Sequence, residues 1–254
     1  MILAIDIGNT NVVIGCIEGE TISCIERIHT DTAETAAEYG IKLLQLLNYR
    51  GIDRYSFEGA IISSVVPQLT EAFRTAIQTI TGIKPLVVGP GMKTGMNVRI
   101  DDPGTLAGDL VVGSVAAMQY YGTPVIVLDM GTATTIVLID RDGSYRGGAI
   151  VPGVRLSLKA LSSGTSLLPD ISLTAPKKCI ATNTVDSMRS GAVFGAVAML
   201  DGMIERMERE IGYECKVVAT GGLASSIVPM CKKDIICDDN LLLKGLWYLY
   251  KKNT

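Results

Sequence analysis

Residues 1–18 read MILAIDIGNTNVVIGCIE: an apolar run, an Asp-x-Gly turn with small polar residues, and a second apolar run. Short apolar runs bounded by glycine and polar residues are typical of buried β-strands. The glycine lets backbone N–H groups approach a ligand, and Asp6 can reach a hydrated cation at a phosphate. An ordinary hairpin turn has the same composition, so this turn by itself leaves both interpretations open.

The same pattern returns in the middle of the chain. Residues 124–140 read PVIVLDMGTATTIVLID, again a strand, an Asp-x-Gly turn with hydroxyl residues and a β-branched strand. Asp129 then matches Asp6 at an offset of 123 residues, close to half of the 254-residue chain. Unrelated hairpins rarely repeat in this way, so the two turns favour a duplicated α/β module that binds a nucleotide.

The remaining pattern predicts the other elements of each half. Strands are expected at 59–67, 145–153 and 216–222, and helices at 32–47, 69–82, 185–212 and 241–252, from apolar periodicity and from glycine or proline at their ends. No low-complexity linker separates the halves. In the first helix, the helical spacing of the apolar residues indicates one buried face, made of Ala37, Ile41, Leu44 and Leu47.

Composition narrows the functional classes. The net charge is −3, and the 23 basic residues form no long run, so no electrostatic footprint for nucleic acid or an anionic membrane is present. No run of about eighteen apolar residues occurs, and no basic region precedes the first apolar stretch as in a signal peptide. Six scattered cysteines without a CxxC are expected as free thiols in the cytoplasm. The only histidine, His29, excludes any histidine-pair mechanism and receives no role.

Four further segments can be interpreted in more than one way. GPGMKTG (89–95) fails as a P-loop because Met92 replaces a required glycine and no helix follows. Thr220-Gly221-Gly222 is a plausible contact for a nucleotide or a plain turn. Asn183 and Thr184 precede a long helix, where a cap is favoured and a carboxylate site is the alternative. In LAGDLVVGSVAA (106–117), Asp109 stands alone as a carboxylate that either caps a helix or faces a substrate.

Ordered motifs along the whole chain resemble the type III pantothenate kinases, members of the acetate and sugar kinase, heat-shock cognate and actin superfamily. They are DIGNTN, AIISSVVP, VGPGMKTGMNVRIDDP, the Asp109 segment, VLDMGTATT, GGAIVPG, the serine- and threonine-containing run at 183–191, VVATGGLA and LLLKGL. The resemblance implies an α/β fold of duplicated ribonuclease H-like (actin-like ATPase) modules. Each module would be a mixed sheet flanked by helices, with a nucleotide cleft between the halves 1–115 and 116–254.

The resemblance also implies an activity, which is ATP-dependent phosphorylation of pantothenate in coenzyme A synthesis. It implies Mg²⁺ and a monovalent cation, K⁺ or NH₄⁺, as cofactors. Asp109 would accept the proton of the attacking hydroxyl, and Asp129 would hold the monovalent cation. ATP would be bound by Asp6, Ile7, Gly8, Asn9, Thr10, Asn11, Val12, Val13 and Thr132, and pantothenate by Ile100, Ala107, Gly108, Asp109, Leu110 and Thr184. Relatives are homodimers with the pantothenate site at the subunit interface, so the same assembly is implied here.

Two positions depart from the family pattern. The family's Gly-Ala-Asp-Arg reads Ala-Gly-Asp-Leu, with Leu110 in place of arginine, and a family tyrosine is Ile100. Leucine has no donor for a substrate carboxylate, and losing a hydrogen bond to a charged group costs about 1.5–3 kcal/mol unless Arg99 or Lys93 replaces it. Two alternatives therefore stay open: a nucleotide-binding regulator that has lost kinase activity, and a kinase for another small hydroxy acid.

Overall fold

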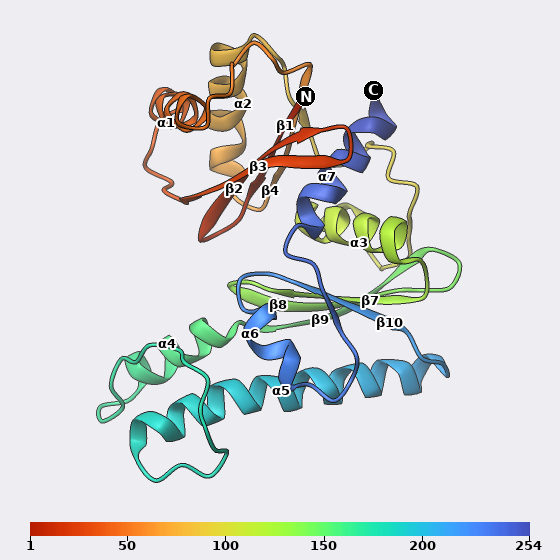
Figure 1. The fold of residues 1–254 in the computed structure, drawn as a ribbon. Coiled ribbons are helices and arrows are strands. Elements are labelled where there is room, and N and C mark those ends of the chain that lie inside the picture. Colours follow the sequence, from red (N-terminus) through yellow and green to blue (C-terminus); the bar gives the residue numbers. More distant parts are fainter. The chain divides into compact units, whose positions relative to one another are not determined.

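Two mixed β-sheets with the same strand order form the framework of the protein (Figure 1). The computed structural model describes residues 1–254. The first sheet has the order β3-β2-β1-β4-β5, and the second contains the matching order β9-β8-β7-β10-β11, with β6 added beside β9. In both sheets the first three strands are antiparallel and the next two run parallel to the central strand. This repetition confirms the duplicated ribonuclease H-like architecture.

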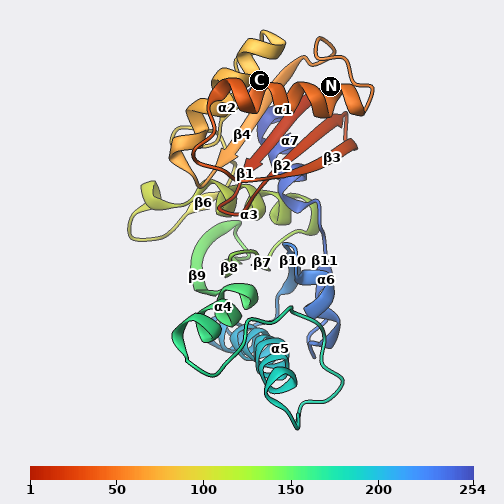
Figure 2. The same ribbon diagram turned by 90° about the vertical axis from the view of Figure 1, so that its left-hand side faces the viewer.

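The first sheet is covered by helices that bury its apolar side chains. Its strands are β1 (Ile2–Ile7), β2 (Asn11–Glu18), β3 (Thr21–His29), β4 (Gly59–Ser64) and β5 (Leu86–Val87), and Figure 2 shows the first four of them side by side. Its helices are α1 (Ala36–Tyr49), α2 (Pro67–Thr81) and α7 (Leu241–Asn253). Alternate residues of β1 and β4, among them Ile5 and Ile62, join the core that includes α1 and α2. The residues between them, including Asp6 and Ser63, face the other side of the sheet.

The second sheet repeats this arrangement with a longer helix. Its strands are β6 (Asn97–Val98), β7 (Val125–Met130), β8 (Ala133–Ile139), β9 (Ser144–Pro152), β10 (Lys216–Thr220) and β11 (Ile236–Cys237). Its helices are α4 (Val154–Gly164), α5 (Thr184–Ile211) and α6 (Ala224–Ile227). In Figure 1, α5 runs along one side of this sheet, and its buried residues, such as Leu200 and Ile204, join the apolar core there. Two 3₁₀ turns occupy Pro103–Thr105 and Val228–Met230.

The chain divides into two compact units that are discontinuous in sequence. The first is Met1–Met96, Asp101–Ala116 and Asn240–Thr254, and the second is Asn97–Ile100 and Ala117–Asp239. The division falls within α3 (Gly108–Tyr121). The expected halves 1–115 and 116–254 are continuous, whereas here the C-terminal helix returns to the first unit, because α7 packs on β1 and β4.

Several local expectations differ from the structure. The first helix begins at Ala36 rather than near residue 32, because Thr35 and Glu38 form a capping box. Its expected face is wrong in part: Ala37 and Ile41 are exposed, while Tyr39 and Leu43 are buried. The strand expected at 59–67 ends at 64, since α2 starts with the proline at its first position. Helix α4 was not expected at all. No helix has the length and apolar character needed to cross a membrane.

Candidate active site

The first Asp-x-Gly turn is held rigidly at the end of β1. Asp6 is only 7% exposed and lies in register with neighbouring residues of β2 and β4. The Gly8 N–H donates to the Asn11 carbonyl over 3.0 Å. Thr30, just after β3, donates from its hydroxyl to the Gly8 carbonyl (2.7 Å) and from its N–H to the Thr10 carbonyl (3.0 Å). These bonds fix the backbone that we expected to bind phosphate.

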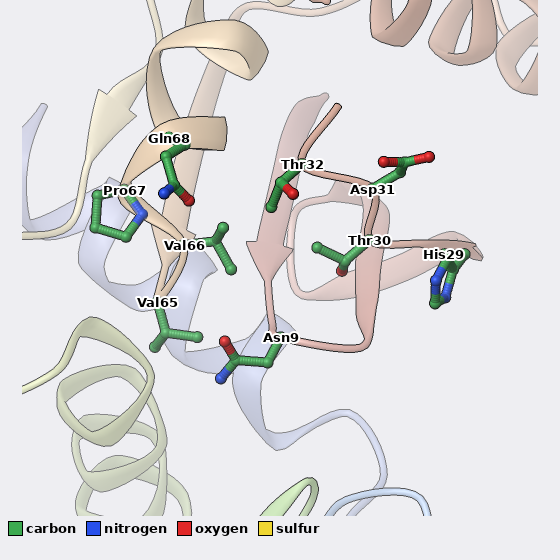
Figure 3. Close-up of a pocket in the computed structure, with 9 residues that line it drawn as sticks. All are labelled: Asn9, His29, Thr30, Asp31, Thr32, Val65, Val66, Pro67 and Gln68. Atoms are coloured by element: carbon green, nitrogen blue, oxygen red, sulfur yellow. The ribbon is translucent and has the colours of Figure 1, made fainter. Parts of the chain in front are cut away.

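An open pocket of about 480 Å³ adjoins this turn (Figure 3). The turn contributes Asn9, whose side-chain amide is exposed, and α2 contributes Gln68 in its first turn. The lining is mostly polar: Asn9, His29, Thr30, Asp31, Thr32, Val65, Val66, Pro67 and Gln68. His29 therefore lines the pocket, although no feature of the sequence predicts a role for it.

The start of α3 lies against the strand that neighbours Asp6. Ser63 of β4 is in register with Asp6, so the two side chains share a face of the sheet. A Cβ atom at Gly108 would lie 3.5 Å from Ser63 Oγ and 3.8 Å from the Ser64 nitrogen. The first unit therefore places Asp6, Ser63 and Gly108, the residue before Asp109, close to one another.

Asp109 is the second residue of α3, inside the helix rather than at its N-cap, and it is the candidate base. Its Oδ1 accepts a hydrogen bond from the Leu110 N–H over 2.7 Å, in the first turn of α3. Asp109 is half-buried, and desolvation raises the pKa of its carboxyl group, while hydrogen bonds from the backbone partly oppose this rise. A partly desolvated carboxylate is a better proton acceptor than one in water, because its pKa lies closer to neutral pH.

The second Asp-x-Gly turn differs from the first by one residue. Asp129, half-buried, pairs in register with Thr135 of β8 and Thr220 of β10. The Gly131 N–H donates to the Ala133 carbonyl (3.0 Å), which closes the turn one residue earlier than in the first turn. The predicted repeat therefore holds for the strands that precede the two turns, whereas the turns themselves differ in length by one residue.

Two glycines pack tightly on this second turn. A Cβ at Gly221, whose φ is +94°, would lie 2.7 Å from Asp129 Oδ1. A Cβ at Gly153 would lie 2.4 Å from the carbonyl oxygens of Gly131 and Thr132. A carboxylate and backbone carbonyls therefore gather here, with close approach only because glycine has no side chain. Oxygen donors of this kind suit a hard cation such as K⁺.

Two of the expected substrate contacts, Thr184 and Ile100, lie in the second unit. Thr184 is the first residue of α5 and is exposed, and the helix is capped by Asn183, whose Oδ1 accepts from the Asp186 N–H (2.9 Å). The cap favoured from the sequence is therefore present. Ile100 packs beside Gly147, at 3.6 Å from its Cβ position.

The two cations considered as replacements for the family arginine are placed differently. Arg99 forms an ion pair with Asp142 over 2.9 Å in the second unit, so its charge is already matched. Lys93 lies in the first unit, and its backbone N–H and carbonyl both bond to the side-chain amide of Asn253 (2.9 and 3.0 Å). The loop around Lys93 leads into no α-helix before α3, which agrees with the rejection of a P-loop.

Comparison with known proteins now supplies the family. Residues 2–206 match the sequence profile of the type III pantothenate kinases. A type III pantothenate kinase of Moorella thermoacetica is 42% identical over 254 residues, and one of Halalkalibacterium halodurans is 41% identical, each alignment covering 100% of both chains. The chain belongs to the type III pantothenate kinase family. This confirms the resemblance drawn from the motifs.

A solved structure outside the family shares its fold. The (R)-2-hydroxyglutaryl-CoA dehydratase component A of Acidaminococcus fermentans aligns with a TM-score of 0.58 at 13% identity, covering 99% of this chain and 98% of that one. At such low identity the likeness concerns the fold alone. The function of this type III family member therefore depends on its own site residues.

One residue of the site was missed from the sequence. AIISSVVP was noted as a motif, but its two serines received no role. In the structure Ser64 Oγ bonds to the backbone of Val66 (3.1 Å), whereas Ser63 Oγ is buried without a hydrogen-bond partner. A hydroxyl pair in an otherwise apolar strand was the available signal.

Proposed function

We propose that this chain phosphorylates pantothenate with ATP to give 4′-phosphopantothenate, the first step of coenzyme A biosynthesis. The full-length match to type III pantothenate kinases carries the proposal. The geometry of the first unit supports it. The buried carboxylate of Asp6 lies close to the start of α3, which carries the partly desolvated carboxylate of Asp109. Phosphoryl transfer needs positioning and charge neutralisation more than covalent help, and glycine turns and carboxylates supply both.

Asp109 is the general base in this proposal. It accepts the proton of the primary hydroxyl of pantothenate while the hydroxyl oxygen bonds to the γ-phosphorus and ADP leaves. Its position at the start of α3 supports this role, because the preceding residue, Gly108, packs on Ser63, which lies in register with Asp6. The Asp6–Val13 turn and strand would bind the ATP phosphates, and Thr132 would be a second nucleotide contact.

The residues present fit the two implied cations. Mg²⁺ is usually bound through one or two carboxylates together with substrate phosphates, and Asp6 provides such a carboxylate at the turn. Asp129 would hold a monovalent cation, supported by the oxygen atoms that crowd Gly153 and Gly221. When bound, these cations offset phosphate charge. No cluster of three His, Cys, Asp or Glu side chains suited to a metal occurs, so each cation would rely on few protein carboxylates.

One assay tests the function and separates its alternatives. Purified protein is incubated with ATP, Mg²⁺, K⁺ and pantothenate, and phosphopantothenate is measured by mass spectrometry. We expect product formation that depends on both cations. ATP binding without consumption would favour a regulator that has lost the chemistry, and faster reaction with another hydroxy acid would favour a different substrate.

Leu110 predicts weak capture of the substrate carboxylate. Restoring the family residue with Leu110→Arg should lower the KM for pantothenate roughly tenfold or more, because a hydrogen bond to a charged group contributes about 1.5–3 kcal/mol. We expect kcat to change less than about twofold, since this contact is made equally before and during transfer. Steady-state kinetics measure both constants.

The matched control for this change is Leu110→Met, which keeps an apolar side chain of similar volume. It should leave the KM for pantothenate near the wild-type value. If Leu110→Arg and Leu110→Met behaved alike, the carboxylate of the substrate would not lie near this position, and a different acid would become the better candidate.

We further propose a cytoplasmic homodimer with the pantothenate site at its subunit interface. All six cysteines are free thiols, which supports a reducing compartment. The second unit exposes large apolar side chains, including Leu167 (91%) and Ile180 (86%), in the segment between α4 and α5 that precedes Thr184. Exposed apolar groups of this kind mark protein interfaces.

The dimer predicts a specific effect of charge at this segment. Leu167→Lys should shift the native mass from dimer to monomer and reduce activity at low enzyme concentration, because a lysine in a buried interface loses its hydration. Light scattering coupled to gel filtration measures the mass. Ile41→Lys, at an exposed apolar residue of α1 in the first unit, is the control and should remain a dimer. A monomeric, fully active wild-type enzyme would contradict the assembly.

A further inference from the structure

Ser63 is one of three residues with a buried side-chain oxygen that lacks a hydrogen-bond partner. The others are Glu34 and Ser114. The Ser63 side chain is 0% exposed, so water does not satisfy its hydroxyl from the surface. Leaving a buried hydroxyl unpaired is costly, so each such group in a native structure calls for a physical explanation.

The Ser63 hydroxyl lies between the strand that carries Asp6 and the start of the helix that carries Asp109, the two carboxylates of the proposed reaction. Ser63 is in register with Asp6 on the neighbouring parallel strand and faces away from the core that contains Ile62. On its other side α3 begins, and a Cβ at Gly108 would lie 3.5 Å from Ser63 Oγ, so helix and strand meet at this hydroxyl. The next residue of the helix is Asp109.

Asp109 has room for one more hydrogen bond. Its carboxylate bonds to backbone N–H groups of its own helix turn, with Leu110 at 2.7 Å, and receives no bond from another side chain. A carboxylate accepts several hydrogen bonds, since each oxygen has two lone-pair sites. The unpaired Ser63 hydroxyl thus meets α3 at Gly108, and the next residue of that helix carries an acceptor with unused capacity.

We propose that Ser63 is a positioning residue that hydrogen-bonds the Asp109 carboxylate in the substrate-bound enzyme. The inference rests on the proposed function. Catalytic hydrogen bonds are often long or absent in free enzymes and form in the complex with substrate. The hydroxyl of Ser63 then orients Asp109 toward the acceptor hydroxyl and stabilises its ionised form, while the proton of the substrate still goes to Asp109.

The direct test is Ser63→Ala in the full-length enzyme. We expect kcat to fall about tenfold or more, as for a hydrogen bond to a charged group, with the KM for ATP within about twofold. The acid limb of the profile of kcat against pH should move up by about one pH unit, because the ionised base loses a stabilising donor. The melting temperature should not fall, since alanine removes an unpaired buried hydroxyl.

Ser114→Ala is the matched control, because Ser114 lies in α3 and its hydroxyl is equally buried and unpartnered. It should change neither kcat nor the pH profile. A double-mutant cycle with Asp109→Asn then asks whether Ser63 acts through Asp109. If it does, adding Ser63→Ala to Asp109→Asn changes the residual rate less than about twofold.

The outcomes separate this inference from the function beneath it. Unchanged kcat and pH profile in Ser63→Ala, with Asp109→Asn strongly impaired, would overturn the role of Ser63 alone. Full additivity in the double mutant, or an equal effect of Ser114→Ala, would also overturn it. Undiminished activity of Asp109→Asn would instead remove the base assignment, and this inference with it.

Discussion

Replacing Asp109 with asparagine should reduce kcat by about 10²–10⁴-fold, the usual contribution of a general base. The amide has nearly the shape of the carboxylate and keeps an oxygen that can accept from the Leu110 N–H, so the start of α3 should be preserved. What the variant loses is the ability to accept the proton of the attacking hydroxyl. Steady-state phosphopantothenate formation measures the change, with ATP binding followed separately by calorimetry.

The Asp109→Asn change should lower activity without lowering the thermal stability of the protein. Because burial raises the pKa of Asp109, folding favours its protonated form, so its contribution to stability is present below the pKa of the unfolded chain and is lost as the pH rises through the folded pKa. At neutral pH the ionised carboxylate is therefore a net cost, and Asp109→Asn should melt at the same temperature as wild type or higher. In the wild type, kcat/KM should fall with acid at a pH above the usual range for aspartate.

Asp102→Asn provides the comparison. Asp102 is an exposed carboxylate that caps the short 3₁₀ turn before α3, with its Oδ1 accepting from the Gly104 N–H over 3.0 Å. Its replacement should leave kcat within about twofold. If Asp102→Asn and Asp109→Asn lowered kcat equally, the loss would reflect disturbance of the segment before α3 rather than removal of a base.

Gly221→Ala, which adds a methyl group against the second Asp-x-Gly turn, should strongly destabilise the protein. The residue has φ of +94°, which an alanine adopts only with strain, and its Cβ would lie 2.6 Å from the Met130 nitrogen and 2.7 Å from Asp129 Oδ1. Left-handed strain of about 1–2 kcal/mol and overpacking of about 1–3 kcal/mol together predict a loss of roughly 2–5 kcal/mol in the free energy of unfolding. Urea denaturation followed by circular dichroism measures it.

The methyl group added by Gly221→Ala should also weaken the binding of the monovalent cation. Displacing Asp129 by a few tenths of an ångström disturbs the oxygen atoms proposed to hold it, so the K⁺ concentration for half-maximal activity should rise. Gly222→Ala is the control in the neighbouring position, because its Cβ would meet no atom within 4 Å. It should change stability by less than about 0.5 kcal/mol. A Gly221→Ala enzyme as stable as Gly222→Ala would refute the predicted crowding.

The repeat of two Asp-x-Gly turns predicted a duplicated α/β module. Apolar strands followed by glycine turns are local features, and their recurrence at 6 and 129 needs no knowledge of tertiary contacts. The buried face of α1 shows where local reading failed. The pattern selected Ile41, but Tyr39 is buried instead, because its ring packs 4.3 Å from Phe73 and its hydroxyl bonds to the Asp31 backbone.

The unit boundaries failed for a related reason. Helix α7 is amphipathic by its own sequence, but the sheet that covers its apolar face is more than 150 residues earlier in the chain. No feature of the helix sequence itself indicates on which of the two sheets it packs. The helix pattern predicted that α7 exists, and packing on β1 and β4 decided which unit it joins.

By itself, the sequence determined the duplicated α/β fold, the family, and the identity of the candidate base and phosphate turn, because strand patterns and ordered motifs are properties of neighbouring residues. Only the tertiary structure decided which of these groups meet. The register of β1 with β4 sets Ser63 beside Asp6, and the packing of α3 on β4 brings Gly108 to the same hydroxyl. Register and helix packing join residues distant in the chain, so the buried, unpaired oxygen of Ser63 could be found only in the folded molecule.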